Sequence, residues 1–386
     1  MRLLSRMSLP LLLLALALAG PAVGSASAYG PSDVVGHVYL NDNTSITNTI
    51  AAFARHADGT LTALPGSPFA AGGAGAGKGL ASQGALQVAD YGRYLLAVDA
   101  GSNQISVLRI NHDGSLEPVS IVSSGGVDPD SIAVHGDLVY VANGNADDIA
   151  GGTNYTGFIL GYDGHLYPLR NSTVNLSDTA APGDVLFNGD GTKLIGTEVG
   201  PSVIDSFTVG WKGLLTAAPG SPFTAQGLGP FGSEFRPTNP NQLFVTNAHN
   251  GTGLGTVSAF NDSFNGTLSS IGSSPFADSQ TAPCWLIISH DGRFLFAVNT
   301  GSGEISSYAI AFGGELTLLG STPVGDTGGV GAVDPGLSPD GRYLYVNETR
   351  IDSVGIFFVN GGNLTELASS PTALPAGATP AGIVVN

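Results

Sequence analysis

The residue that departs most clearly from its surroundings and could do chemistry is Glu198. It stands in the stretch IGTEVG (195–200), where related stretches of the same chain mostly carry Asn or Asp, as in FAVNTG (296–301). Partial burial raises the pKa of a carboxylate and allows it to act as a general base. Two further groups follow similar stretches, His249 and Arg350, and either could polarise a carbonyl or stabilise an oxyanion. These three residues form the candidate catalytic set.

A repeated sequence motif, called the phrase here, must supply the strands that position these side chains. SHDGRFLFAVNTG (289–301) and SPDGRYLYVNETR (338–350) are two of seven copies, and the others begin near residues 36, 92, 136, 191 and 241. The copies lie roughly 43 to 56 residues apart, which is the spacing of propeller blades. Each phrase precedes an alternating segment such as EISSYAI (304–310), and Asp-Gly or Gly-Gly turns lead on to a short further strand.

Another short apolar segment, usually opened by Pro or Gly, precedes each phrase. Examples are APGDVLFN (181–188) and APCWLIIS (282–289), with LASQGALQV (80–88) as a looser copy. The pattern predicts an all-β fold, a seven-bladed β-propeller of four-stranded blades. The terminal segment TPAGIVVN (379–386) is similar to these inner-strand segments, but no copy of the phrase follows it. We therefore expect the C-terminal strand to close the first blade, within a single domain over residues 29–386.

In such a ring, the start of each inner strand and the end of the next strand open on one face around the central channel. Polar and aromatic residues at these places are predicted to converge there, although they are distant in the sequence. The predicted binding residues of this rim are Asp99, Asp130, Asn143, Asp184, Asn247, Trp285, Asn299, Asn347 and Glu348. An alternative stays open, in which these groups only cap strand ends and bind water.

The N-terminus predicts export. MRLLSRMSLPLLLLALALAGPAVGSASA (1–28) has basic residues, a short apolar run and a small-residue end, which is typical of a signal peptide cleaved after Ala28. We expect a secreted, extracellular protein that acts as a monomer. The formal net charge of −17 disfavours nucleic acid and anionic membranes as partners. The single cysteine, Cys284, allows no internal disulfide.

Several motifs of other enzyme classes are incomplete or missing. GGAGAGKG (72–79) nearly matches the motif of a phosphate-binding loop, but Gly79 occupies the position where Ser or Thr is needed. The sequence has no Gly-x-Ser-x-Gly elbow and no His-Glu-x-x-His pair. Its seven histidines are scattered without metal-ligand spacing. We expect no cofactor and no metal, although Asp and Asn oxygens on the rim leave a calcium ion as an open possibility.

The recurring phrases resemble the lactonase-type seven-bladed propeller family, which includes bacterial 6-phosphogluconolactonases and fungal carboxymuconate cyclases. The resemblance covers essentially the whole mature chain. In hydrolases of that family an inner strand opens with Pro-Arg-His and the following strand ends at Asn-Glu. The matching places here read Pro182-Gly183-Asp184 and Thr197-Glu198, so the acid is present and the arginine and histidine are absent. A second family histidine would fall at Asp130 or Ser131 and is also missing.

The resemblance implies a lactonase-like hydrolase with Glu198 as the base that activates water. Because the chain is acidic and lacks the arginine that a phosphosugar would need, the expected substrate is a neutral lactone. The alternative is a non-catalytic extracellular binding module that recognises a glycan, a peptide or a cell-wall component through the rim. Loss of the family's His and Arg favours the module, whereas retention of Glu198 favours the enzyme. The expected ligand is a small-molecule lactone or a carbohydrate.

Overall fold

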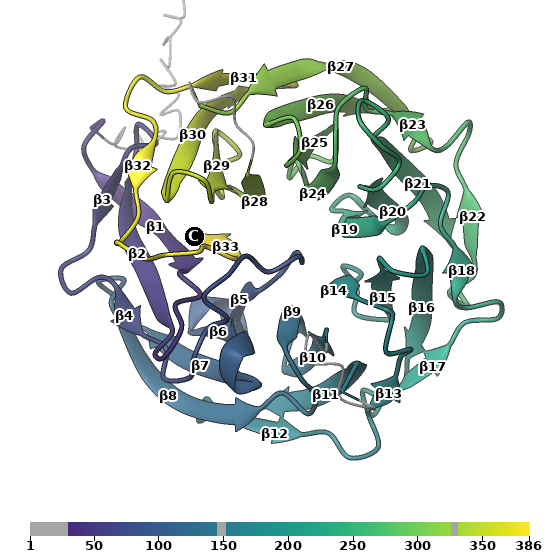
Figure 1. The fold of residues 1–386 in the computed structure, drawn as a ribbon, viewed down its shortest axis with the longest axis horizontal. Helices are drawn as coiled ribbons and strands as arrows, with labels where there is room; N and C mark the ends of the chain where they lie inside the picture. Colours follow the sequence, from purple (N-terminus) through teal and green to yellow (C-terminus); the bar gives the residue numbers. More distant parts are fainter. Residues whose placement is uncertain (1–29, 145–151, 326–330) are drawn as a thin grey trace, which may run out of the picture.

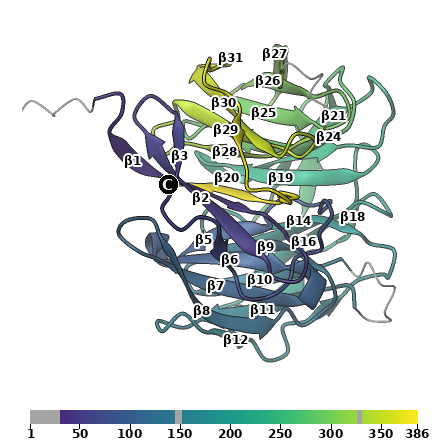
Figure 2. The same ribbon diagram turned by 60° about the vertical axis from the view of Figure 1, so that its left-hand side comes forward.

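The described residues form seven β-sheets that stand side by side in a ring. A computed structural model of the chain describes residues 30–144, 152–325 and 331–386. Figures 1 and 2 show the sheets following one another in chain order around a central axis. The predicted seven-bladed β-propeller is therefore confirmed. The predicted signal peptide lies outside the described residues. Within the described ranges, no helix has the length and apolar character needed to span a bilayer.

Each blade has four antiparallel strands from the axis outward, and blades are numbered here in chain order. The inner strands of blades 1 to 7 are β33 (Ile383–Val385), β5 (Leu86–Ala89), β9 (Pro129–His135), β14 (Pro182–Phe187), β19 (Pro230–Arg236), β24 (Pro283–Ile288) and β28 (Ala332–Leu337). The second strands are β1 (Val34–Asn41), β6 (Tyr94–Asp99), β10 (Leu138–Asn143), β15 (Lys193–Glu198), β20 (Asn239–Asn247), β25 (Phe294–Asn299) and β29 (Tyr343–Glu348). The third strands are β2 (Thr49–His56), β7 (Gln104–Ile110), β11 (Asn154–Leu160), β16 (Val203–Val209), β21 (Thr256–Asp262), β26 (Glu304–Ile310) and β30 (Ser353–Asn360).

The outer strand is continuous in blades 2 and 6 and divided in the other five. The continuous strands are β8 (Leu116–Ser123) and β27 (Leu316–Pro323). The divided ones are β3 (Leu61–Ala63) with β4 (Phe69–Ala70), β12 (Leu166–Pro168) with β13 (Val174–Asn175), β17 (Leu215–Ala217) with β18 (Phe223–Thr224), β22 (Leu268–Ser270) with β23 (Phe276–Ala277), and β31 (Asn363–Glu366) with β32 (Thr372–Ala373). Two short 3-10 turns, η1 (Asp90–Gly92) and η2 (Ala100–Ser102), flank β6.

Serine side chains bridge the breaks in the divided outer strands. The Ser67 hydroxyl accepts a hydrogen bond from the Ala52 N–H at 2.9 Å, and the Ser274 hydroxyl accepts one from the Ala259 N–H at 2.7 Å. A proline follows each of these serines, and proline has no N–H with which to continue the ladder. The hydroxyl thus satisfies a third-strand donor that the broken outer strand leaves free.

The hydrophobic core lies between neighbouring blades. One buried cluster joins Tyr140 of blade 3 to Leu194 and Phe207 of blade 4, and the other clusters follow the same pattern around the ring. Tyrosine hydroxyls reinforce the packing, because Tyr140 donates to the carbonyl of Gly213 in the next blade at 2.8 Å. Tyr39 makes the same bond to Gly114 at 2.9 Å. Each blade therefore buries its faces only against its two neighbours.

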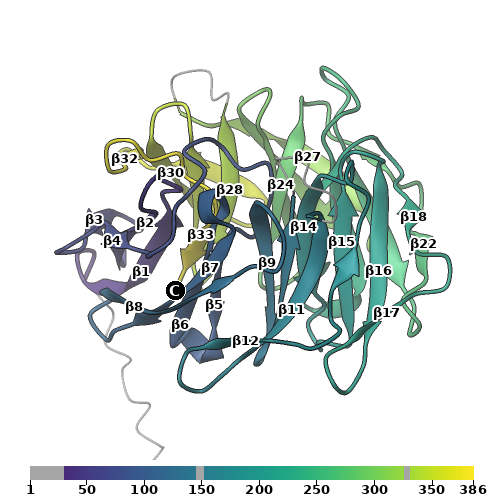
Figure 3. The ribbon, with the colours of Figure 1, turned by 60° about the horizontal axis from the view of Figure 1, so that its bottom comes forward.

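The C-terminal strand closes the ring as predicted. β33 pairs antiparallel with β1, with Val38 opposite Val385, and Figure 3 shows β33 on the inner side of β1. The last residue adds a side-chain contact, since the His37 N–H donates to Oδ1 of Asn386 at 2.8 Å. Gly36 is required beside it, because a Cβ there would lie 1.9 Å from the Asn386 carbonyl oxygen. The first and last blades are thus one sheet.

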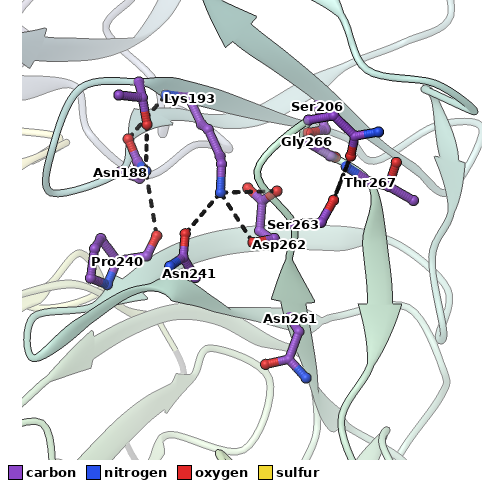
Figure 4. Close-up of polar contacts among 12 residues, drawn as sticks. Asn188, Lys193, Ser206, Pro240, Asn241, Asn261, Asp262, Ser263, Gly266 and Thr267 are labelled. Atoms are coloured by element: carbon purple, nitrogen blue, oxygen red, sulfur yellow. Dashed lines mark hydrogen bonds and ion pairs between the residues drawn. The ribbon is translucent and has the colours of Figure 1, made fainter.

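A buried ion pair joins blades 4 and 5 (Figure 4). The Lys193 ammonium lies 3.4 Å from Oδ1 of Asp262, and both side chains are almost fully buried. Lys193 also donates to Oδ1 of Asn241 at 2.9 Å and to the Asp262 carbonyl at 3.1 Å. Burial raises the pKa of the Asp262 carboxyl to about 6, and the nearby ammonium limits the rise.

Candidate active site

Six predicted site residues occupy one equivalent position, the last ladder residue of a second strand. Ladder pairs such as Asn143 with Pro129, Asn247 with Pro230 and Asn299 with Pro283 place this position opposite the start of the inner strand. The six residues are Asp99, Asn143, Glu198, Asn247, Asn299 and Glu348. They therefore lie at the same end of the ring, and we call this end the rim.

In most blades the rim side chain bonds the third strand of its own sheet. Asn247 donates to the Ser258 hydroxyl at 2.8 Å, and Asn299 donates to the Ser306 hydroxyl at 3.0 Å. The carboxyl of Asp99 accepts a hydrogen bond from the Ser106 hydroxyl in the same way. Asn143 donates to Oδ1 of Asn154 at 3.0 Å. These bonds hold the end of the second strand against the third strand of the same blade.

Asn347 lies one residue before the rim position of blade 7. Its side chain therefore points to the other side of β29, and it donates to the carbonyl of Gly382 in blade 1 at 3.4 Å. Glu348 holds the rim position itself, and its Oε1 lies 2.6 Å from where a Cβ on Gly355 would stand. Burial raises the pKa of Glu348 to about 7. The ladder thus assigns the rim position to Glu348 and places Asn347 between blades.

Blade 4 replaces the usual neutral partner by a second carboxyl group. Glu198 at the end of β15 is in side-chain contact with Asp205 on β16, and the Tyr155 hydroxyl of blade 3 donates to Oδ2 of Asp205 at 3.0 Å. The pKa of Glu198 is raised to about 8, mainly by burial and secondly by the neighbouring Asp205. Burial also raises the pKa of Asp205. Two buried carboxyls in contact favour a form that shares one proton.

His249 and Arg350 lie apart from this pair. Both side chains are exposed, on the turns that follow β20 and β29 in blades 5 and 7. In the part of the chain that the structure describes, no hydrogen bond or ion pair links either residue to Glu198. The predicted catalytic set is therefore not assembled by direct contacts, whereas Glu198 gains a partner, Asp205, that was not predicted.

Three predicted residues, Asp130, Asp184 and Trp285, lie on inner strands. Oδ2 of Asp184 accepts hydrogen bonds from the Ser233 N–H and hydroxyl at 2.9 and 2.8 Å, and Oδ1 accepts one from the Ser131 hydroxyl at 3.2 Å. Asp184 therefore ties the inner strands of blades 3, 4 and 5 together. Burial raises its pKa to about 7. Burial and the charges of nearby carboxyls raise the pKa of Asp130 well above its usual range.

Residues 82–84 plug the channel at its rim end, as the loop before β5 shows in Figure 1. The Trp285 indole donates to the Ser82 carbonyl at 2.9 Å, from blade 6. Gln83 donates to the Ser233 carbonyl at 3.0 Å and accepts from the Leu286 N–H at 3.0 Å. The prediction that residues 80–88 copy an inner strand is wrong for the first half, because β5 begins only at Leu86.

Below the plug, the channel holds a cavity of about 360 Å³ lined by all seven inner strands. Its carboxyls are Asp184, Glu234 and Asp334. Burial raises the pKa of Glu234 to about 8 and that of Asp334 to about 7. Within the described residues, no group of His, Cys, Asp or Glu has the arrangement of a metal site. Burial also raises the pKa of the Cys284 thiol to about 11, which makes it a poor nucleophile.

Known proteins share this fold. Residues 37–151 match the family model described as "Lactonase, 7-bladed beta-propeller". The crystal structure of a candidate 6-phosphogluconolactonase from Bacteroides uniformis superposes with a TM-score of 0.74 and 20% identity, over 91% of this chain and 99% of that one. The periplasmic gluconolactonase of Pseudomonas aeruginosa gives a TM-score of 0.71 and 20% identity, over 90% and 98%. The curated proteins gave no match. The family match and the observed ring together confirm the resemblance to the lactonase-type seven-bladed β-propeller family.

Proposed function

We propose that this protein is a lactonase-type hydrolase that opens a neutral lactone, with the Glu198–Asp205 carboxyl pair as its base. The match to the lactonase family model supports the reaction class. The observation that carries the proposal is the pair itself, because it is the departure of one blade from a repeated arrangement. The equivalent contacts of Asn247 and Asn299 go to serine hydroxyls. A second buried carboxyl adds charge repulsion and a desolvation cost, so it is unfavourable for folding. Its presence therefore points to a role in function and not in stability.

The pair supplies a base that is active near and above neutral pH. When the shared proton leaves, Glu198 takes a proton from a water molecule, and the water oxygen forms a bond to the lactone carbonyl carbon. The ring C–O bond then breaks, and the leaving oxygen takes up the proton to give a hydroxy acid. The Tyr155 hydroxyl holds Asp205 in place through its 3.0 Å bond to Oδ2. The proposal rests on the pair alone, because among the described residues no hydrogen bond or ion pair links His249 or Arg350 to it.

The surroundings of the pair favour an uncharged substrate. The Tyr155 hydroxyl donates to Asp205, and its pKa is raised by burial and then by the charges of Asp205, Glu198 and Asp130. The pair shares one proton and keeps one negative charge, which would repel a phosphorylated or carboxylated lactone. We also propose that the protein is exported, on the strength of residues 1–28. Mass spectrometry of the secreted chain should then find Tyr29 at its N-terminus.

Hydrolysis of neutral lactones by wild type and Glu198→Gln tests the proposed function. Glucono-δ-lactone and δ-valerolactone are suitable substrates, with 6-phosphogluconolactone as the charged comparison. Glu198→Gln should lower the rate by about 10² to 10⁴. The matched control is Glu304→Gln, which removes a carboxyl at the start of β26, at the same end of the ring. Equal rates for the three proteins would overturn the proposal, provided that their melting temperatures agree.

The second candidate is the non-catalytic binding module. Two observations favour it: Glu198 is only 6% exposed, and residues 82–84 fill the centre of the rim. His249 and Arg350 are exposed at the same end of the ring. If wild type hydrolyses no lactone above the uncatalysed rate, and a glycan or peptide array gives a hit that His249→Ala or Arg350→Ala abolishes, the binding module replaces the enzyme.

A further inference from the structure

The turn between the first and second strands of blade 2, at the end of the ring opposite the rim, carries an exposed tyrosine. In blades 6 and 7 the turn from first to second strand carries Asp before Gly, and Oδ1 of Asp291 and of Asp340 accepts a backbone N–H two residues on, at 3.0 and 3.1 Å. Blade 2 reads ADYGR (89–93), so Tyr91 takes the place of the aspartate. Its φ is 53°, a left-handed conformation that tyrosine rarely adopts, and its ring is fully exposed.

A second exposed ring stands beside this turn. Tyr162, on the turn after β11 in blade 3, is 84% exposed. The guanidinium carbon of Arg93 lies 4.5 Å from the centre of the Tyr162 ring, and Nη1 of Arg93 lies 3.1 Å from Oδ2 of Asp90. Arg93 also lies 6.0 Å from the ring centre of Tyr94, as the corresponding Arg293 lies over the ring of the residue that follows it. Arg93 thus connects the turns of two blades.

The two turns form the walls of a groove of about 720 Å³ between blades 2 and 3. Its lining includes Tyr91, Tyr162 and Asp90, and the turn of residues 135–137 contributes His135 and Asp137. The volume lies within the range of small-molecule sites. β9 runs from the rim at Pro129 to His135, so the groove opens at the end of the ring opposite Glu198.

We infer that this groove binds a neutral saccharide. The C–H faces of a sugar ring stack on exposed tyrosine rings, and tyrosine combines such an apolar face with a polar tip. The carboxyls of Asp90 and Asp137 can accept hydrogen bonds from sugar hydroxyls. Arg93 is already paired with Asp90, so the groove offers no unpaired cation to a phosphate or carboxylate ligand. The site is distinct from the carboxyl pair and does not depend on the proposed hydrolysis.

Calorimetric titration with maltose, cellobiose and xylobiose tests the inference, with glucuronic acid as the anionic comparison. The informative variants are Tyr162→Ala and Tyr91→Asp, because aspartate is the residue of blades 4, 6 and 7 at this turn position. The matched control is Trp211→Ala: Trp211 is 91% exposed at the turn position of blade 4 that corresponds to Tyr162, and it does not line the groove.

At least one of the disaccharides should bind wild type, and both tyrosine variants should weaken binding by roughly tenfold or more. Trp211→Ala should bind like wild type, and Tyr91→Asp should melt no lower than wild type. Lactone hydrolysis should be unchanged in all three variants, which separates this site from the proposed active site. The inference is overturned if no disaccharide binds, if glucuronic acid binds in preference, or if both tyrosine variants bind as well as wild type.

Discussion

The carboxyl group of Glu198 on β15 lies in contact with that of Asp205 on the neighbouring strand β16, and burial raises the pKa of both. The third partner, Tyr155, comes from the adjacent blade and donates to Asp205. The arrangement needs the propeller, because it draws on two strands of one sheet and one strand of the next. It also explains why a repeated scaffold can hold a single site: one substituted position in one copy is enough.

Loss of the closing strand should destabilise the whole ring. Deleting residues 379–386 removes β33, which pairs with β1 and carries the Asn386 contacts to His37 and Arg55. We expect a loss of several kcal/mol in the free energy of unfolding, since the first blade would keep an unpaired inner edge. Thermal denaturation followed by circular dichroism measures the effect. An unchanged melting temperature would show that the ring does not depend on this strand.

Breaking the buried ion pair should be costly and dependent on pH. Lys193→Met leaves Asp262 buried without its cation, which should lower the free energy of unfolding by about 3–5 kcal/mol at pH 8. The loss should be smaller at pH 5, where the Asp262 carboxyl, whose pKa burial already raises, becomes protonated. Urea denaturation at the two pH values measures this difference. The double variant Lys193→Met/Asp262→Leu is the control and should be closer to wild type. A loss equal at both pH values would contradict the prediction.

The channel carboxyls should make the protein less stable as the pH rises. Asp184 and Asp334 have folded-state pKa values of about 7, and Glu234 has one of about 8, all above those of an unfolded chain. The folded state therefore holds protons that the unfolded state has lost, and stability falls between about pH 4 and pH 8. Each carboxyl should contribute roughly 1 kcal/mol or more.

Melting curves of wild type and Asp184→Asn across this range measure the slope. The variant should show a shallower fall, because its amide cannot ionise and can still accept the hydrogen bonds from Ser233. If the two proteins lose stability in parallel, the Asp184 carboxyl is not protonated in the folded state at the start of the range.

The sequence pattern predicted the ring well because the repeat is mainly a packing device. Alternating apolar residues and glycine turns recur in every copy, and they specify the blades, their order and the closing role of residues 379–386. Register is harder to predict at a strand end: the ladder gives the rim position to Glu348 and turns Asn347 towards the next blade. The plug was not predicted, because LASQGALQV (80–88) resembles the other inner-strand segments closely enough to hide that β5 begins only at Leu86.

Asp205 was missed although the sequence contains a signal for it. Aligning the third strands puts Asp205 in the column of Ser106, Ser258 and Ser306, so a charged residue in place of serine marks the position. Its contact with Glu198 follows from antiparallel pairing, in which residues two apart on one strand share a face. The role of Tyr155 could not be found in this way, because it depends on how adjacent blades pack.

The most direct test of the carboxyl pair is the pH dependence of kcat/KM for glucono-δ-lactone in wild type and Asp205→Asn, corrected for the uncatalysed reaction. In wild type the rate should rise with pH, with its midpoint near the Glu198 pKa of about 8. Asp205→Asn removes the neighbouring negative charge, so the pKa of Glu198 should fall and the midpoint should move to lower pH. The same midpoint in both proteins, or full activity in Glu198→Gln, would contradict the assignment of Glu198 as the base.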